Sequence, residues 1–511
     1  MSGREMRPAP PPPRAAPAGR LPRWLPPGSN RRGIAWTLAG AGIPAAIAIA
    51  AIPRIASGLG PERFGVLILA WTVIGYAAFL QLGLGRAVAR HASADRRRDS
   101  RVLAPVVWTA LAISGALGTA AAGALFFFAA AIARGIHVPP GMVAEAASAF
   151  RLLALALPFT VTAPVLGGVL EARRRFGLVN AVAMPTAALT YLGPVAALAL
   201  APGLVPVVGV LCAARLASWC ALAALCVREI PRLRGPRMHR RLVKPLLAYG
   251  GWATVSAIVS PLLVYLDRFV VAAMASAAAA AYYGTGQEVA LRLGIASGAV
   301  VTVLFPAFAA VPRRDGARLG QLLERGVAAV ALLVLPLSLL LAAFAGDLLR
   351  LWVGPEYAAE GEAVLAWLAA GLLVNGLAKV PSTLLQAVGR PDLTAWLHLA
   401  ELPLFVALLG AFVWRWGIEG AAVAWLARVS VDCVALFWVV RGRIPETGRA
   451  ALRAAAVGLG GAGAIAALRL LPGPGARGLL LAAIASAFAV AWLGRERFFG
   501  PMPGLFPGRD G

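Results

Sequence analysis

The chain has 511 residues, of which 60% are hydrophobic and 14% are charged, and its mean hydropathy is +0.78. Soluble domains are about half apolar and about a quarter charged, so this composition excludes an ordinary soluble protein and indicates a polytopic membrane protein. The formal net charge of +26 could suit a nucleic-acid binder, but the basic residues lie between long apolar runs.

Residues 1–33 are rich in proline and arginine and show no periodicity. Such a segment forms no packed core and favours a disordered or polyproline conformation. We interpret it as a disordered cytoplasmic tail, with a docking peptide for a partner as the alternative. The first apolar run begins near Ile34 and lacks a small-residue cleavage signature, so it is expected to be retained as a helix.

An apolar run of about 20 residues is long enough to cross the hydrocarbon core of a membrane. The chain contains a series of such runs, which predicts an all-α polytopic membrane protein with about 14 transmembrane helices. In chain order the runs lie near residues 34–52, 64–85, 102–133, 143–170, 178–200, 203–227, 246–272, 280–310, 322–345, 360–387, 393–414, 418–440, 449–470 and 477–494.

The basic residues are distributed unevenly among the connecting segments. Of the 48 lysines and arginines, 35 lie in the N-terminal tail and in every second loop, seven in the alternate loops and ends, and six inside the runs. This is the positive-inside pattern, and it predicts that both termini are cytoplasmic. The net charge then serves orientation and contact with anionic membrane lipid, so no nucleic-acid partner is expected.

The two halves of the sequence resemble each other. "ARLASWCALAALCVREIP" (214–231) aligns with "ARVSVDCVALFWVVRGRIP" (427–445), and "VLEARRRFGLVN" (169–180) aligns with "LLQAVGRPDLTA" (384–395). The stretch "RFG" likewise falls on "YYG" 219 residues later. Each repeat holds six runs, so both face the same way and are related by an axis along the membrane normal.

This repeat sets the predicted organisation of the chain. Transporters built from such repeats bind their substrate between the two bundles. The expected parts are a disordered tail, an N-terminal six-helix bundle, a basic cytoplasmic linker, a C-terminal six-helix bundle, and two extra helices with a short cytoplasmic tail, over residues 1–33, 34–227, 228–245, 246–441 and 442–511.

Several stretches between about residues 246 and 440 carry a family resemblance. "YGGWATVSAIVSPLLVYLDRFVV", "YYGTGQEVALRL", "LRLWVGPEY" and "LLQAVGRPDLTAWLHLAELPLF" resemble the polysaccharide biosynthesis proteins, the Wzx-type oligosaccharide flippases of the multidrug/oligosaccharidyl-lipid/polysaccharide transporter superfamily. The resemblance implies a MATE-like, alternating-access transporter in the bacterial cytoplasmic membrane. It also implies that the substrate is an oligosaccharide on undecaprenyl diphosphate, flipped to the outer leaflet, and that polysaccharide assembly proteins are candidate partners.

Charged residues inside membrane spans are rare and costly, so they mark functional sites or interfacial anchors. Asp267 and Arg268 are the only charged residues between positions 246 and 281. Arginine suits a diphosphate because its planar fork donates two charge-assisted hydrogen bonds. We therefore predict that Arg268, Arg292 and Lys379 contact the diphosphate or acidic groups of the sugar. A snorkelling anchor near the outer interface is the alternative for Asp267 and Arg268.

The acidic residues inside the spans are candidates for coupling to H⁺ or Na⁺. Asp267, Glu288 and Glu401 are the carboxylates considered, and His398 lies one turn from Glu401. The alternatives are structural: Glu288 and Arg292 are four residues apart and suit a salt bridge on one helix face, and His398 and Glu401 suit a local pair. No other cofactor and no metal site is expected.

Three further intramembrane residues are expected to be structural. Arg428 and Asp432 are four residues apart and suit a salt bridge along one helix, and Arg215 is the repeat mate of Arg428. Pro381 follows Lys379 closely and is expected to break its helix, as at transporter cavities.

The sequence gives little support for an enzyme. It contains no G-x-S-x-G, H-E-x-x-H, P-loop or paired Cys/His pattern, and no loop long enough for a soluble catalytic domain. The rival functions are a lipid II flippase, a membrane glycosyltransferase or polysaccharide polymerase, and a drug or cation antiporter. The many intramembrane cations disfavour the last of these.

Overall fold

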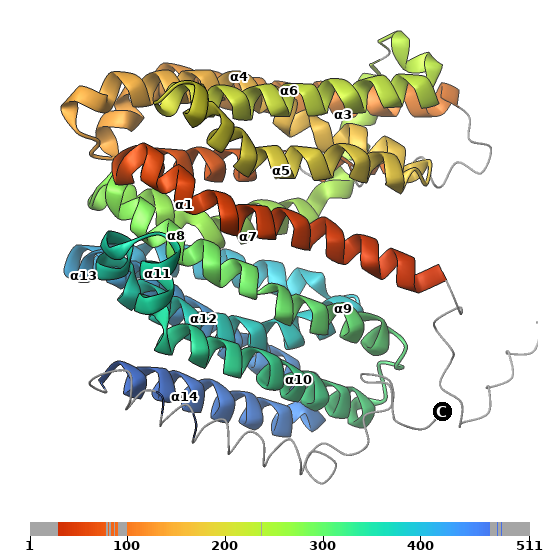
Figure 1. Cartoon of the computed structure of the whole chain (residues 1–511). Coiled ribbons are helices and arrows are strands. Elements are labelled where there is room, and N and C mark those ends of the chain that lie inside the picture. The colour runs from red at the N-terminus through yellow and green to blue at the C-terminus, as the bar shows by residue number, and fades with distance from the viewer. Residues whose placement is uncertain are drawn as a thin grey trace, which may run out of the picture. The chain divides into compact units, whose positions relative to one another are not determined.

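The structure is a computed structural model, and it describes residues 29–77, 100–236 and 238–470, with positions 80, 83–85, 87–89, 478 and 482 (Figure 1). The chain divides into two compact units, residues 1–43 and 44–511. The contacts described here belong to the second unit. Residues 1–28 of the predicted tail lie outside the described residues, and residues 29–33 belong to the first helix.

Within the described residues, all regular secondary structure is helical. Short 3₁₀ turns at Pro140–Met142, Pro231–Arg234, Arg240–Leu242 and Pro445–Thr447 accompany the α-helices. The α-helices, labelled as in Figure 1, are α1 (Ser29–Ala77), α3 (Ser100–Gly135), α4 (Val143–Ala172), α5 (Phe176–Leu200), α6 (Leu204–Glu229), α7 (Val243–Met274), α8 (Ala277–Leu293), α9 (Ile295–Ala309), α10 (Gly316–Ala343), α11 (Ala345–Trp352), α12 (Pro355–Ala387), α13 (Pro391–Arg441) and α14 (Gly448–Leu470).

These helices confirm the predicted all-α polytopic fold. In the described part of the chain, ten helical stretches are long and apolar enough to cross a membrane. Two of them contain a backbone break that divides them into two spans, at Gly60 (φ 74°) in α1 and Gly417 (φ 58°) in α13. The run predicted at 477–494 lies outside the described residues, so the count of 14 stays a prediction. The expected break at Pro381 is wrong, because α12 continues through it.

The internal repeat is confirmed in the backbone of the connecting turns. The α4–α5 and α12–α13 turns each contain a left-handed residue, Arg174 (φ 59°) and Gly389 (φ 75°), whose numbers differ by 215. In both turns the next N–H donates to the carbonyl five residues back, at 2.9 and 2.8 Å. Ile230 (φ −137°, ψ 84°) and Ile444 (φ −136°, ψ 83°), which precede equivalent 3₁₀ turns, also match.

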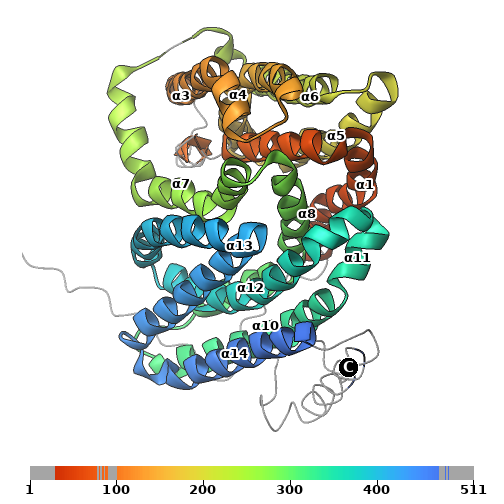
Figure 2. The same cartoon turned by 90° about the vertical axis from the view of Figure 1, so that its left-hand side faces the viewer.

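Each half of the molecule has a central helix. We call α1 to α6 the N-terminal half and α7 to α13 the C-terminal half. In the N-terminal half α4 packs against α3, α5 and α6, and in the C-terminal half α12 packs against α8 to α11 and α13 (Figures 1 and 2). These two repeat mates are the most buried of the candidate spans, with 67% and 78% of their most apolar stretch buried. Both are surrounded because the repeat gives them the same place in each bundle.

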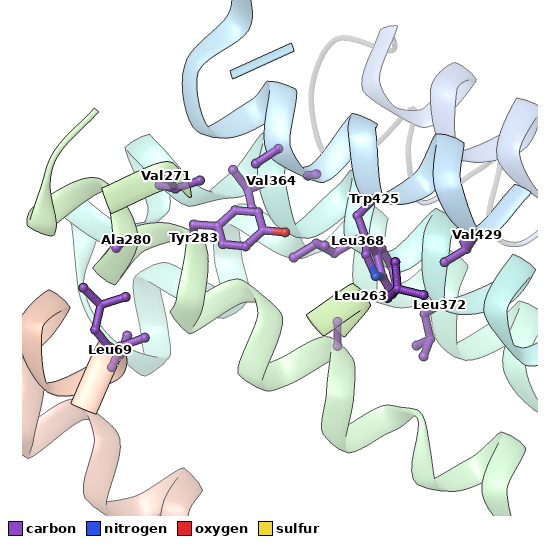
Figure 3. Packing of buried hydrophobic residues seen from close by; sticks show 14 of the residues in the cluster. Leu69, Leu263, Val271, Ala280, Tyr283, Val364, Leu368, Leu372, Trp425 and Val429 are labelled. Atoms are coloured by element: carbon purple, nitrogen blue, oxygen red, sulfur yellow. The ribbon is translucent and has the colours of Figure 1, made fainter. Parts of the chain in front are cut away.

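The C-terminal half packs directly on α1. Figure 3 shows buried Tyr283 of α8, Leu368 of α12 and Trp425 of α13, and Leu69 of α1 belongs to the same hydrophobic cluster. Two glycines allow this approach. A Cβ atom on Gly65 would overlap the backbone carbonyl of α8 at its first residue, and one on Gly284 would lie 2.8 Å from an α1 side chain. These are the glycines of the repeated "RFG" and "YYG" stretches.

Exposed tryptophans along α13 indicate how it lies in a membrane. Trp396 and Trp414 are 54% and 81% exposed, and their 18-residue separation corresponds to about 27 Å of helix. Such a spacing matches the aromatic belts on the two sides of a hydrocarbon core about 30 Å thick. Arg428 lies between Gly417 and Arg441, about 16 Å from the first and about 20 Å from the second, and therefore near the middle of the membrane.

Candidate functional site

Asp267 and Arg268 are buried inside the protein, 0% and 1% exposed. The Asp267 carboxylate accepts hydrogen bonds from the Tyr283 hydroxyl at 2.6 Å, the Gln287 amide at 2.8 Å and the backbone N–H of Arg268 at 2.8 Å. Tyr283 and Gln287 are four residues apart and share one face of α8. Because α8 covers Asp267 in this way, the interpretation of Asp267 and Arg268 as a snorkelling anchor does not fit the structure.

The Arg268 guanidinium connects three helices. Its Nε donates to Gln287 Oε1 and its Nη2 donates to Glu288 Oε1 at 2.9 Å, both on α8. Its Nη1 donates to Thr72 Oγ1 on α1 at 3.3 Å. The guanidinium carbon also lies 5.2 Å from the centre of the Tyr265 ring. Arg268 thus ties the C-terminal half to the N-terminal half through Thr72.

Arg292 makes a second connection of the same kind. Its Nη1 donates to Glu288 Oε2 at 2.7 Å, so the structure forms the salt bridge expected from the four-residue spacing. Its Nη2 donates to the Tyr191 hydroxyl of α5 at 3.0 Å, and its guanidinium carbon lies 5.6 Å from that ring centre. Glu288 is therefore held between two arginines. We call Asp267, Arg268, Glu288 and Arg292 the α7–α8 cluster.

A second buried group of charges lies on α13. Arg428 Nη1 is 3.6 Å from Glu401 Oε2, and His398 Nε2 is 3.8 Å from Asp432 Oδ1. The partners differ from the sequence prediction, which paired Arg428 with Asp432 and His398 with Glu401. The break at Gly417 is the reason, because it lays the two arms of α13 side by side and lets charges pair across them. We call these four side chains the α13 cluster.

The two clusters differ in how well their polar atoms are satisfied. In the α13 cluster, Glu401 is 3% exposed and Arg428 and Asp432 are each 5% exposed. Both Glu401 carboxylate oxygens, Asp432 Oδ1 and Arg428 Nε have no hydrogen-bond partner. In the α7–α8 cluster two carboxylates face two arginines and every one of these side chains is hydrogen-bonded. The unmet hydrogen bonds are thus concentrated on α13.

The remaining two predicted residues lie on other helix contacts. Lys379 of α12 donates from Nζ to Ser297 Oγ of α9 at 3.0 Å. Arg215 of α6 donates from Nη2 to Thr190 Oγ1 of α5 at 3.1 Å. Arg215 and its repeat mate Arg428 each reach the preceding span of their own half, but the partner is a hydroxyl in one half and a carboxylate in the other.

Sequence reasoning missed four residues of the α7–α8 cluster's surroundings. The sequence could have indicated Tyr283 and Gln287, because they lie four residues apart on α8, the helix that directly follows the Asp267 segment. It could not have indicated Thr72 and Tyr191, since each lies in an apolar run far from α7 in the sequence. Their proximity to the arginines follows from the packing of the two halves.

A family comparison places this arrangement among known proteins. The family model described as "Polysaccharide biosynthesis protein" matches residues 55–361, which is more than half of the chain. The chain belongs to this family. The resemblance noted in the sequence is therefore confirmed, and the protein is a multi-pass membrane protein.

Individual relatives agree with this assignment. The chain is 31% identical over 404 residues to a candidate O-antigen transporter of Shigella flexneri, covering 79% of this chain and 96% of the relative. It is 26% identical over 411 residues to the succinoglycan biosynthesis transport protein ExoT of Rhizobium meliloti (strain 1021), covering 76% and 75%. Among solved structures, the lipid II flippase MurJ in an inward closed conformation superimposes with a TM-score of 0.73 at 11% identity, covering 91% of this chain and 100% of that one. The structural match shows a shared fold.

Proposed function

We propose that this protein is a flippase for an oligosaccharide linked to undecaprenyl diphosphate. It moves the substrate from the cytoplasmic to the outer leaflet of the bacterial cytoplasmic membrane by alternating access of its two halves. Both curated relatives are named for the transport of polysaccharide components, and neither is named as an enzyme. The positive-inside pattern supports cytoplasmic termini, and polysaccharide assembly proteins are the expected partners.

One observation carries the proposal: buried Arg268 and part-buried Arg292 of the C-terminal half both touch the N-terminal half inside the membrane. A cation in hydrocarbon is costly unless it is paired or serves an anionic ligand. Arg268 and Arg292 each have a carboxylate partner, yet each also directs one nitrogen across the boundary between the halves. A diphosphate travelling between the halves would find these donors in its path.

Lys379 adds a third cation to this chemistry. Its described hydrogen bond goes to a neutral hydroxyl, that of Ser297, which is itself 0% exposed. An ammonium held by a neutral acceptor keeps donors for an anionic group. We assign Lys379 to the diphosphate or to acidic groups of the sugar.

The α13 cluster supports coupling to protons. Within this cluster Glu401 and Asp432 are two buried carboxylates, and Arg428 is the single guanidinium, 3.6 Å from Glu401. One negative charge is therefore in excess when both carboxylates are ionised and His398 is neutral. An uncompensated charge this deeply buried is costly, and binding one proton removes it. We therefore propose that Glu401 binds a coupling proton, with His398 as its entry or exit.

Coupling can be measured in vesicles that contain the purified protein and a lipid-linked oligosaccharide. A pH gradient is expected to accelerate flipping, and Glu401→Gln is expected to abolish the acceleration. Glu324→Gln is the matched control. Glu324 forms a 2.8 Å ion pair with Arg453 and does not belong to the α13 cluster. Flipping that responds to a sodium gradient and ignores a proton gradient would contradict the assignment.

The function itself is tested in a deletion strain without a redundant flippase. Lipid-linked repeat units are expected to accumulate on the cytoplasmic side and surface polysaccharide to fall, and the wild-type gene should restore both. Normal surface polysaccharide in that strain would refute the proposal. Lipid II, the alternative substrate, presents the same diphosphate, so the vesicle assay should be run with both lipids. Faster flipping of lipid II would favour the alternative.

A further inference from the structure

The two halves meet along a seam that changes from apolar to polar with depth. Near the α7–α8 turn, Phe64 of α1 lies edge-on to Tyr357 of α12 at 6.3 Å, and Gly65 fits against the backbone at the start of α8. Two turns further along α1, Thr72 meets Arg268. The residues from Phe64 to Thr72 cover about 12 Å of helix. We call these contacts, with Tyr191 and Arg292, the seam.

The polar end of the seam is held by two hydrogen bonds to neutral hydroxyls. Thr72 donates its own hydroxyl proton to the carbonyl of Ile68 at 2.7 Å, so toward Arg268 it acts as an acceptor. Tyr191 accepts from Arg292 at 3.0 Å. The ionised partner of both arginines, Glu288, belongs to the C-terminal half.

The arginine bonds to Glu288, within the C-terminal half, therefore differ in strength from the arginine bonds to the hydroxyls of the N-terminal half. A guanidinium binds a carboxylate or phosphate oxygen more strongly than a neutral hydroxyl oxygen, because the two partners then carry opposite charges. Of the bonds described for Arg268 and Arg292, separating the halves breaks only those to Thr72 and Tyr191, and it leaves Arg268, Glu288 and Arg292 joined to one another. The nitrogens freed by separation are Arg268 Nη1 and Arg292 Nη2.

We propose that the hydroxyls of Thr72 and Tyr191 are exchangeable acceptors that hold the seam closed, and that phosphate oxygens displace them from Arg268 and Arg292 and so open it. The proposal rests on the proposed function, because it takes the diphosphate of the cargo as the displacing anion. The N–H bonds of Arg268 Nη1 and Arg292 Nη2 that point at the two hydroxyls cannot point at phosphate oxygens at the same time. Closure of the seam therefore competes with binding of the diphosphate through these N–H bonds, and arrival of the cargo shifts the seam toward its open state.

The test measures seam opening without any transport. Spin labels at Glu62→Cys and Glu360→Cys, which flank Phe64 and Tyr357, report the distance across the seam in nanodiscs. Inorganic pyrophosphate is the probe, with sodium chloride at equal ionic strength as the reference. Pyrophosphate is expected to move the wild-type distance distribution from short to long. Thr72→Val with Tyr191→Phe should open the seam without pyrophosphate, raising the open-to-closed ratio roughly ten-fold per lost hydrogen bond.

Matched controls separate the exchange from general loosening. Thr285→Val removes a hydroxyl bonded at 2.7 Å within α8, and Tyr282→Phe removes one bonded to Glu356, so neither change crosses the seam. Both should keep the wild-type distribution and its response to pyrophosphate. A wild-type distribution that ignores pyrophosphate, or a Thr72 and Tyr191 double variant that stays closed, would overturn the proposal. Either result leaves the flippase assignment standing, because the deletion strain tests that separately.

Discussion

Replacement of Arg268 gives the sharpest test of the site geometry. Arg268→Ala removes an ion pair to Glu288 and hydrogen bonds to Gln287 and Thr72 from a position that is 1% exposed. Breaking a buried ion pair from one side costs about 3–5 kcal/mol. Glu288 keeps its 2.7 Å contact with Arg292, so we expect the lower end, about 3 kcal/mol.

Arg268→Lys separates stability from substrate contact. It keeps the positive charge, but a single ammonium cannot match the three directions of the guanidinium. Loss of the bonds to Gln287 and Thr72 is expected to cost about 1–2 kcal/mol. At roughly 2 °C per kcal/mol for a chain of this size, the melting temperature should fall by about 6 °C for alanine and about 2–4 °C for lysine.

The melting temperature can be followed with a thiol-reactive dye. Cys226 and Cys433 are 1% and 8% exposed and become reactive on unfolding. Arg453→Ala is the control, because its ion pair with Glu324 is half exposed and should contribute less than about 1 kcal/mol. An Arg268→Ala protein that melts within about 1 °C of wild type would refute the buried network. Arg268→Lys at normal protein level with wild-type export would refute the contact with substrate.

Three further outcomes are expected. Gly65→Ala should prevent closure of the seam and abolish export, because its Cβ would overlap the Ala277 carbonyl. Gly75→Ala is the control, because its Cβ would meet open space and both closure and export should be unchanged. Spin-label distances and the amount of surface polysaccharide check both variants. Lys379→Gln should reduce flipping in vesicles at least ten-fold while the melting temperature changes by less than about 2 °C, since it loses a charge but can still donate to a hydroxyl; unchanged flipping would remove Lys379 from the site. Trp352→Phe loses a 2.7 Å bond to an α1 carbonyl, and thermal melting should show a cost of about 1 kcal/mol with normal export; a loss of export at normal stability would instead give this bond a role in transport.

Much of the fold could be predicted from local sequence patterns. Apolar length predicts a span without knowledge of its neighbours, so the described α-helices other than the short α11 overlap the predicted runs. Repeated turn residues such as Arg174 and Gly389 fix equivalent turns, because a turn is closed by hydrogen bonds among residues adjacent in the chain. The Glu288–Arg292 salt bridge belongs to the same class, since four residues along one helix set its geometry.

The side-chain pairs between helices could not be predicted from local sequence patterns. Spacing within α13 predicted that Arg428 pairs with Asp432 and His398 with Glu401, and the structure exchanges the partners across the break at Gly417. Likewise, nothing in the spacing predicts that Thr72 receives a hydrogen bond from Arg268.

The sequence by itself determined that this protein crosses a membrane many times, repeats a six-helix unit and places charges within its spans. Only the tertiary structure decided which of those charges meet and which bonds join the two halves. Helical periodicity fixes the face on which a side chain lies. The partner on that face depends on the depth and angle at which helices far apart in the sequence pack, and local spacing does not encode either quantity.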